Sequence, residues 1–106
     1  MAIFKEIQNS EKLDELLGSS AEKPVVLFKH SNTCGISADL YEQVSTVDAE
    51  INLVTVQISR GISNEIESRL GIRHASPQAF VVKDGKVIYS ASHYAISPSE
   101  IEKHLK

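Results

Sequence analysis

The chain has 106 residues, of which 42% are hydrophobic and 24% charged. This length corresponds to one domain over residues 1–106, and the composition argues against intrinsic disorder. The formal net charge is −3 and the basic residues are scattered, which argues against nucleic acid as a partner, because its binding depends on phosphate neutralisation. We also expect no membrane contact, since the longest apolar run is far shorter than the ~20 residues of a membrane span.

The first half of the chain predicts a parallel β–α–β unit. Asn9 or Ser10 can cap a helix that Gly18 would end, and the continuous apolar run after Pro24 is typical of a strand buried on both faces. The helix after the polar loop at 30–33 should start close to Cys34. In chain order we expect a short strand at 2–6, a helix at 10–17, a strand at 25–28, a helix from about 34 to 48 and a strand at 52–58, with Val54, Val56 and Ile58 on one face.

The second half predicts a helix, a hairpin and a closing helix. Ile62, Ile66 and Leu70 recur at helical spacing, and Gly71 can end that helix. Asp84-Gly85 separates apolar runs at 79–82 and 87–89, which is a strong signal for a type I′ hairpin turn. The segment 97–100, Ser-Pro-Ser-Glu, combines a Ser cap, Pro at the first helical position and Glu at the third.

This order indicates an α/β fold of the thioredoxin type. A central mixed sheet, made of a parallel βαβ half and an antiparallel hairpin, would be flanked by helices. Other small folds share the order of elements, so the prediction also depends on the residues that form the site.

Cys34 is the single cysteine of the chain. It cannot form an internal disulfide, and it implies a reducing cytoplasm. One thiol also excludes zinc held by clustered thiolates, so we expect no metal site. Cys34 stands where a buried strand ends and a helix begins. There the free N–H groups and the helix dipole stabilise a thiolate, which is the nucleophile of disulfide exchange.

The alternative is that Cys34 is a small buried hydrophobic residue, as free cysteines often are. Against this, its neighbours Asn32, Thr33, Gly35 and Ser37 are small and polar, and we expect them to contact substrate. Ser37 stands one helical turn after Cys34, where a dithiol oxidoreductase has its second cysteine. A mixed disulfide on Cys34 must therefore wait for an outside thiol, which favours exchange with a small thiol.

Ser76-Pro77 precedes the first strand of the hairpin. In the thioredoxin fold this place holds a cis-proline that faces the nucleophile, and the backbone beside it can pair with an extended substrate. The alternative is an ordinary trans proline that starts an edge strand. We therefore add Ser76 and Pro77 to the expected substrate-binding residues.

Four further residues are possible auxiliaries. His30 could stabilise the thiolate or help to bind an anion, and Arg73 and His74 could form a small positive rim before Ser76. Lys29 and Arg73 are interpreted as solvated cations unless they contact an acidic ligand. His93 and His104 have no partner in the sequence pattern.

The segment Phe28-Lys-His-Ser-Asn-Thr-Cys-Gly-Ile-Ser37 resembles the monothiol bacilliredoxins of the YtxJ type. The resemblance continues through 72–78 and 92–97. This family consists of thioredoxin-fold proteins of low-GC Gram-positive bacteria and some relatives. They are linked to bacillithiol, a small thiol built from glucosamine, malate and cysteine. One departure is Gly35, because proline commonly follows the active cysteine in the family.

The resemblance implies removal of bacillithiol from S-bacillithiolated proteins. Cys34 would attack the bacillithiol sulfur and keep the bacillithiol, and a second thiol would regenerate Cys34. Bacillithiol would then be a co-substrate and no cofactor would be bound. The partners would be bacillithiol and S-bacillithiolated proteins, and nothing in the sequence demands a dimer, so we expect a monomer.

Two other functions remain open at this point. Cys34-Gly-Ile-Ser37 also resembles the Cys-Gly-Phe-Ser motif of monothiol glutaredoxins, which bind a bridging [2Fe–2S] cluster with glutathione. However, Ile36 replaces the aromatic residue, and the Gly-Gly pair that holds the glutathione carboxylate is missing. The third possibility is a non-enzymatic binding module with an incidental thiol.

Overall fold

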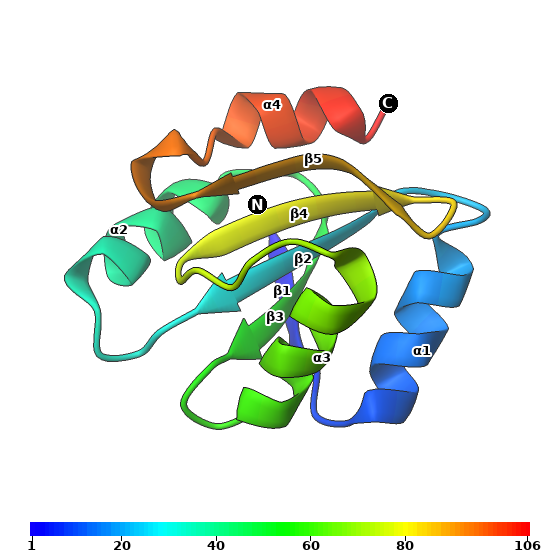
Figure 1. Cartoon of the computed structure of the whole chain (residues 1–106). Helices are drawn as coiled ribbons and strands as arrows, with labels where there is room; N and C mark the ends of the chain where they lie inside the picture. The colour runs from blue at the N-terminus through cyan, green and yellow to red at the C-terminus, as the bar shows by residue number, and fades with distance from the viewer.

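A five-stranded mixed sheet forms the centre of the molecule, with helices on both faces (Figure 1). The computed structural model describes residues 1–106. Its elements are β1 (Ile3–Glu6), α1 (Ser10–Ser19), β2 (Val25–His30), α2 (Gly35–Val44), β3 (Glu50–Thr55), α3 (Arg60–Leu70), β4 (Gln78–Lys83), β5 (Lys86–Ser92), the short 3₁₀ helix η1 (His93–Ala95) and α4 (Pro98–His104). None of these helices has the length and apolar character needed to cross a membrane.

The strand order is β1-β3-β2-β4-β5. β1 and β2 both pair with β3 in parallel, β4 runs antiparallel to β2, and β5 runs antiparallel to β4. This is the predicted βαβ half joined to a hairpin, so the predicted fold class is confirmed. Lys29 pairs with Gln78, and the carboxyl end of β2 therefore lies beside the start of β4.

Each face of the sheet has its own apolar core. Alternate residues of β2 point to opposite sides, so Phe28 packs with Leu40 of α2 and Ile101 of α4, whereas Leu27 packs with Leu13 of α1 and Ile66 of α3. All six of these side chains are almost completely buried. The continuous apolar run of β2 thus reflects a strand covered on both faces.

Three predicted turn and cap signals are confirmed. Asp84 and Gly85 both have positive φ, 55° and 72°, as a type I′ turn requires. Gly71 ends α3 in the left-handed conformation with φ 72°, and the Ser97 side chain accepts a hydrogen bond from the Glu100 N–H at the start of α4.

Several predicted boundaries are wrong. Gly18 lies inside α1, which continues to Ser19 and is capped by Ser20. α2 ends at Val44 instead of near residue 48, because the hydroxyls of Ser45 and Thr46 bond to carbonyls of the last turn and stop the helix.

The strand predicted at 52–58 is also shifted, to 50–55. β2 ends at His30, whose carbonyl accepts the last hydrogen bond from the Val56 N–H, so no residue of β2 pairs with β3 beyond Thr55. The chain then turns, with the Ile58 N–H donating to the Thr55 carbonyl. Ile58 is 75% exposed and therefore does not share the inward face of Val54.

Candidate active site

The loop between β2 and α2 is held by Gln57, which follows β3. The Gln57 side chain accepts a hydrogen bond from the Asn32 N–H (3.1 Å) and donates to Ser31 Oγ (2.6 Å) and Thr33 Oγ1 (3.0 Å). No motif in the sequence marks Gln57. Only the parallel pairing of β2 and β3, which brings their carboxyl ends to one edge, places it beside the loop.

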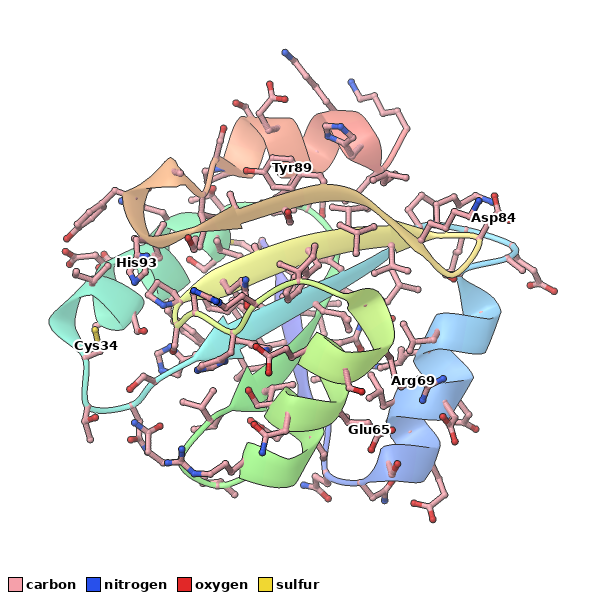
Figure 2. The ribbon with its side chains drawn as sticks, in the orientation of Figure 1. Cys34, Glu65, Arg69, Asp84, Tyr89 and His93 are labelled. Atoms are coloured by element: carbon pink, nitrogen blue, oxygen red, sulfur yellow. The ribbon has the colours of Figure 1, made fainter.

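Cys34 is the residue that caps α2. It has extended backbone angles (φ −110°, ψ 125°), and α2 begins at Gly35, close to Cys34 as predicted. The side chain is partly exposed and forms no capping hydrogen bond. Figure 2 shows it at one end of the molecule, beside the start of α2.

The pKa of the Cys34 thiol is lowered by the first turn of α2. The backbone N–H of Ser37 is the main cause, and the Ile36 N–H and the Ser37 hydroxyl add to it, against a contribution from desolvation that raises the pKa. These are the free donors of a helix N-terminus, which stabilise an anion. Cys34 therefore lies where a thiolate is favoured and where a small reagent can reach it.

Ser37 is completely buried, and its hydroxyl accepts a hydrogen bond from the Ser31 N–H at 3.3 Å. It joins the loop before Cys34 to the helix after it. Gly35 is the first residue of α2, and apart from its chain neighbours and the backbone of its own helix no atom lies within 4 Å of the position a Cβ would take there. The space around Gly35 is therefore open.

The Ser76–Pro77 peptide bond is cis, as predicted. Pro77 is buried and its carbonyl accepts a hydrogen bond from the His93 N–H at 3.0 Å, so this carbonyl is not free for a substrate. The backbone N–H and carbonyl of Ser76 have no partner within the chain. Ser76 is thus the residue of this pair whose backbone can still bind an extended substrate.

The loop before Pro77 is tied to β4 by Gln78. Its side chain donates to the Arg73 carbonyl (2.9 Å) and accepts from the Ala75 N–H (3.2 Å). Arg73 is exposed, and its guanidinium takes part in no ion pair or hydrogen bond. It is therefore a free cation at this edge of the sheet.

Lys29 is not the solvated cation that its residue type suggested. Its side chain is fully buried, because it points to the same face as Leu27 and lies over the Phe80 ring, 6.0 Å from the centroid. Burial lowers the pKa of Lys29, whereas nearby Glu67 raises it. The Lys29 ammonium lies 3.2 Å from His74 Nδ1.

The expected positive charges on His30 and His74 are not supported. Desolvation is the main cause that lowers the pKa of both side chains below that of a free imidazole, which favours their neutral forms. The His30 ring packs 5.1 Å from the Tyr41 ring and does not contribute to the lowered pKa of Cys34. The positive rim is therefore reduced to Arg73.

Tyr94 is a second residue that sequence analysis missed. It lies in η1, which packs against α2, and its hydroxyl donates to Asp39 Oδ2 at 2.9 Å. The Asp39 hydrogen bond is the main cause that raises the pKa of Tyr94, and the negative charge of Cys34 adds to it. Figure 2 shows the neighbouring His93 at the same end of the molecule as Cys34.

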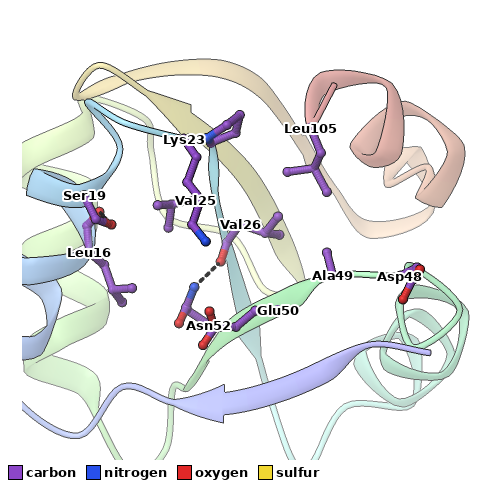
Figure 3. A pocket seen from close by; sticks show the side chains of 11 residues that line it. Leu16, Ser19, Lys23, Val25, Val26, Asp48, Ala49, Glu50, Asn52 and Leu105 are labelled. Atoms are coloured by element: carbon purple, nitrogen blue, oxygen red, sulfur yellow. Dashed lines mark hydrogen bonds between the residues drawn. The ribbon is translucent and has the colours of Figure 1, made fainter.

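No group of three or more His, Cys, Asp or Glu side chains in the structure could hold a metal ion. A cavity of about 320 Å³ lies near the amino ends of β2 and β3, lined among others by Val26, Asn52 and Leu105 (Figure 3). Cys34 follows the opposite, carboxyl end of β2. This cavity is therefore separate from the thiol.

The mixed sheet, the cis-proline and the single thiol at a helix N-terminus define a thioredoxin-fold protein of the thiol oxidoreductase class. A solved structure described as a candidate oxidoreductase with a thioredoxin fold is 28% identical, with a TM-score of 0.85 over 99% of this chain and 94% of that one. Two thioredoxins share the fold at lower identity. The one from Fasciola hepatica is 16% identical (TM-score 0.75; 96% of this chain, 99% of that one), and a mutant thioredoxin from Halobacterium salinarum is 17% identical (TM-score 0.72; 97% and 88%).

The family model described as Monothiol bacilliredoxin BrxC matches residues 5–101. The chain therefore belongs to the monothiol bacilliredoxin family, and the resemblance seen around Cys34 is confirmed. The single cysteine agrees with the monothiol character of the family.

Proposed function

We propose that this protein removes bacillithiol from S-bacillithiolated proteins by thiol–disulfide exchange at Cys34. The observation that supports this most is the place of the sulfur, which is partly exposed at the N-terminus of α2 with a lowered pKa. Family membership supports bacillithiol as the small thiol.

The reaction has two exchange steps. The Cys34 thiolate attacks the bacillithiol sulfur of the client's mixed disulfide; the Cys34–bacillithiol bond forms, the client disulfide breaks, and the client leaves as a thiolate. A second bacillithiol thiolate then attacks the bacillithiol sulfur held on Cys34. Bacillithiol disulfide forms and the Cys34 thiolate is restored. Ser37 cannot replace the second thiol, because a hydroxyl does not form a disulfide.

The residues around Cys34 have separate roles in this proposal. Asn32, Thr33 and Gly35 form the surface on which the small thiol lies, and Ser37 supplies its N–H and hydroxyl to the thiolate. The free backbone groups of Ser76 bind the extended segment of the client, as a strand edge does. Pro77 holds Ser76 in place at the start of β4.

We place the reaction in the cytoplasm, because a free nucleophilic thiol persists in a reducing compartment. The partners are bacillithiol and S-bacillithiolated proteins, which the protein binds as a monomer.

Intact mass after incubation with oxidised bacillithiol tests the proposal. The wild type should gain the mass of one bacillithiol and lose it again when reduced bacillithiol is added. Cys34→Ser should gain nothing. Oxidised glutathione, offered in parallel at the same concentration, should modify the wild type more slowly.

Reconstitution with iron, sulfide and a small thiol under anaerobic conditions distinguishes the [2Fe–2S] carrier. We expect the protein to stay colourless. A brown protein whose absorbance disappears in Cys34→Ser, together with no bacillithiol adduct, would favour the cluster carrier and contradict the proposed exchange.

A further inference from the structure

A buried cation lies directly behind the loop that leads to Pro77. Lys29 has no exposed surface, and its ammonium reaches the loop at His74 Nδ1, 3.2 Å away. The backbone of His74 is also held in place, because its N–H donates to the Glu67 carboxylate at 2.6 Å. The nearby Glu67 carboxylate also raises the pKa of Lys29.

This contact determines which nitrogen of His74 carries the proton. When Lys29 is protonated, its ammonium can only donate, so Nδ1 accepts from it. The hydroxyl of Ser63 lies 3.3 Å from the same nitrogen and can donate to it as well. A neutral imidazole with Nδ1 as the acceptor has its proton on Nε2, and His74 therefore presents an N–H donor away from Lys29.

An open groove of about 390 Å³ begins at this loop. It is lined by loop residues 72–75, by Gln78 and by residues 90–92 of β5. The exposed residues Arg73 and His74 are among those that line it, together with Ser90 and Ser92. No Asp or Glu lines the groove, so its charged and hydrogen-bonding side chains suit an anion.

The groove adjoins the Pro77 end of the hairpin. Gln78 follows Pro77 directly, and Ser92 pairs with Gln78 across the two strands of the hairpin. His93, the next residue, donates its N–H to the Pro77 carbonyl. A small molecule joined to Cys34 would have to extend past Pro77 to reach the groove.

We propose that this groove is a carboxylate-binding site in which Arg73 and the Nε2–H of His74 hold the malyl carboxylates of the small thiol. This inference deepens the proposed function and depends on it for the identity of the ligand. Arg73 is suited to carboxylates because its planar guanidinium can donate two parallel hydrogen bonds. Lys29 is a positioning residue, since it sets the tautomer of His74 from within the core.

Two disulfides that differ only in the malyl group test the proposal. One is oxidised bacillithiol, and the other is the disulfide of cysteinyl-glucosamine. Adduct formation on Cys34 is followed by intact mass under single-turnover conditions. The wild type should react roughly tenfold faster with the malyl compound, as expected for a charge-assisted hydrogen bond. In Arg73→Gln this ratio should fall to about one, while Lys103→Gln, which changes an exposed lysine on α4, should retain it.

A titration that does not use the thiol separates this proposal from the exchange reaction. Malate is added to Cys34→Ser protein labelled with ¹⁵N, and the side-chain signals of Arg73 and His74 are followed. We expect an Nε2–H tautomer at His74 and malate-dependent shifts of both signals. In Lys29→Met, whose fold is checked by circular dichroism, the Nε2–H preference should be lost.

Each outcome has a distinct meaning. Equal rates for the two disulfides, with no shift on adding malate, would overturn the carboxylate site and leave the exchange reaction intact. If neither disulfide forms an adduct, the proposed function is contradicted. The malate titration would then still show whether the groove binds carboxylates. If Arg73→Gln slows the reaction with an acidic client but not the reactions with the two disulfides, the groove binds client carboxylates. That result would refute its assignment to the small thiol.

Discussion

Replacing Ser37 with alanine separates the two sources of thiolate stabilisation at Cys34. The change removes only the hydroxyl, whereas the Ser37 N–H, the main cause of the lowered pKa, stays in place. The pKa of Cys34 should therefore rise slightly and remain below that of a free cysteine. The pH dependence of iodoacetamide alkylation measures this directly.

The same change also has a cost in stability that the structure allows us to estimate. Ser37 is completely buried, so no water can replace its hydroxyl, and the buried N–H of Ser31 loses its partner. An unsatisfied buried donor costs about 1–3 kcal/mol. The Ser31–Ser37 hydrogen bond of 3.3 Å is longer than the usual ~2.9 Å, so we expect a loss of about 1 kcal/mol.

Urea denaturation of Ser37→Ala, with Ser45→Ala at the far end of α2 as the control, tests this estimate. The hydroxyl of Ser45 bonds to a carbonyl of the last turn and is only partly buried, so its loss should cost less. The reasoning is refuted if Ser37→Ala has wild-type stability. It is also refuted if the pKa of Cys34 rises to that of a free cysteine, because the backbone N–H groups would then not be the main cause of the lowered pKa.

The remaining predictions concern the pH dependence of stability and the effect on stability of replacing two glycines. Because folding lowers the pKa of Cys34, the wild type should be more stable than Cys34→Ala at pH values above the unfolded-state pKa of the thiol. This advantage should disappear as the pH falls through the folded-state pKa, and denaturation curves at several pH values would show it; an advantage that grows toward acid pH would contradict it. Gly71→Ala should lower stability by about 1–2 kcal/mol, because φ at residue 71 is +72°. Gly18→Ala, inside α1 with open space around it, should instead raise stability by up to about 1 kcal/mol, and thermal melts of both variants compare the signs.

The sequence was most informative where a local pattern determines the structure. The Asp84-Gly85 turn and the Gly71 stop require positive φ, and the Ser97 cap needs only its own helix. The place of Cys34 between a buried strand and a helix could be predicted for the same reason. Gly18 was misjudged because glycine is tolerated inside a helix that packs well, as α1 does through Leu13.

The contacts between distant segments could not be predicted. Gln57 reaches the Cys34 loop only because β2 and β3 end at the same edge. The burial of Lys29 depends on α3 and the 72–76 loop covering that face, and a charged residue at the end of an apolar run gives no sign of it. The hydrogen bond between Tyr94 and Asp39 depends likewise on how η1 packs against α2.

The most direct test of the central claim follows one bacillithiol from a client protein to Cys34. A bacillithiolated client is mixed with an equal amount of this protein, without any other thiol, and both intact masses are read over time. We predict that the client loses one bacillithiol, that this protein gains one, and that the adduct persists until free bacillithiol is added. Release of the client with no adduct on Cys34, or an unchanged rate in Cys34→Ser, would contradict the account.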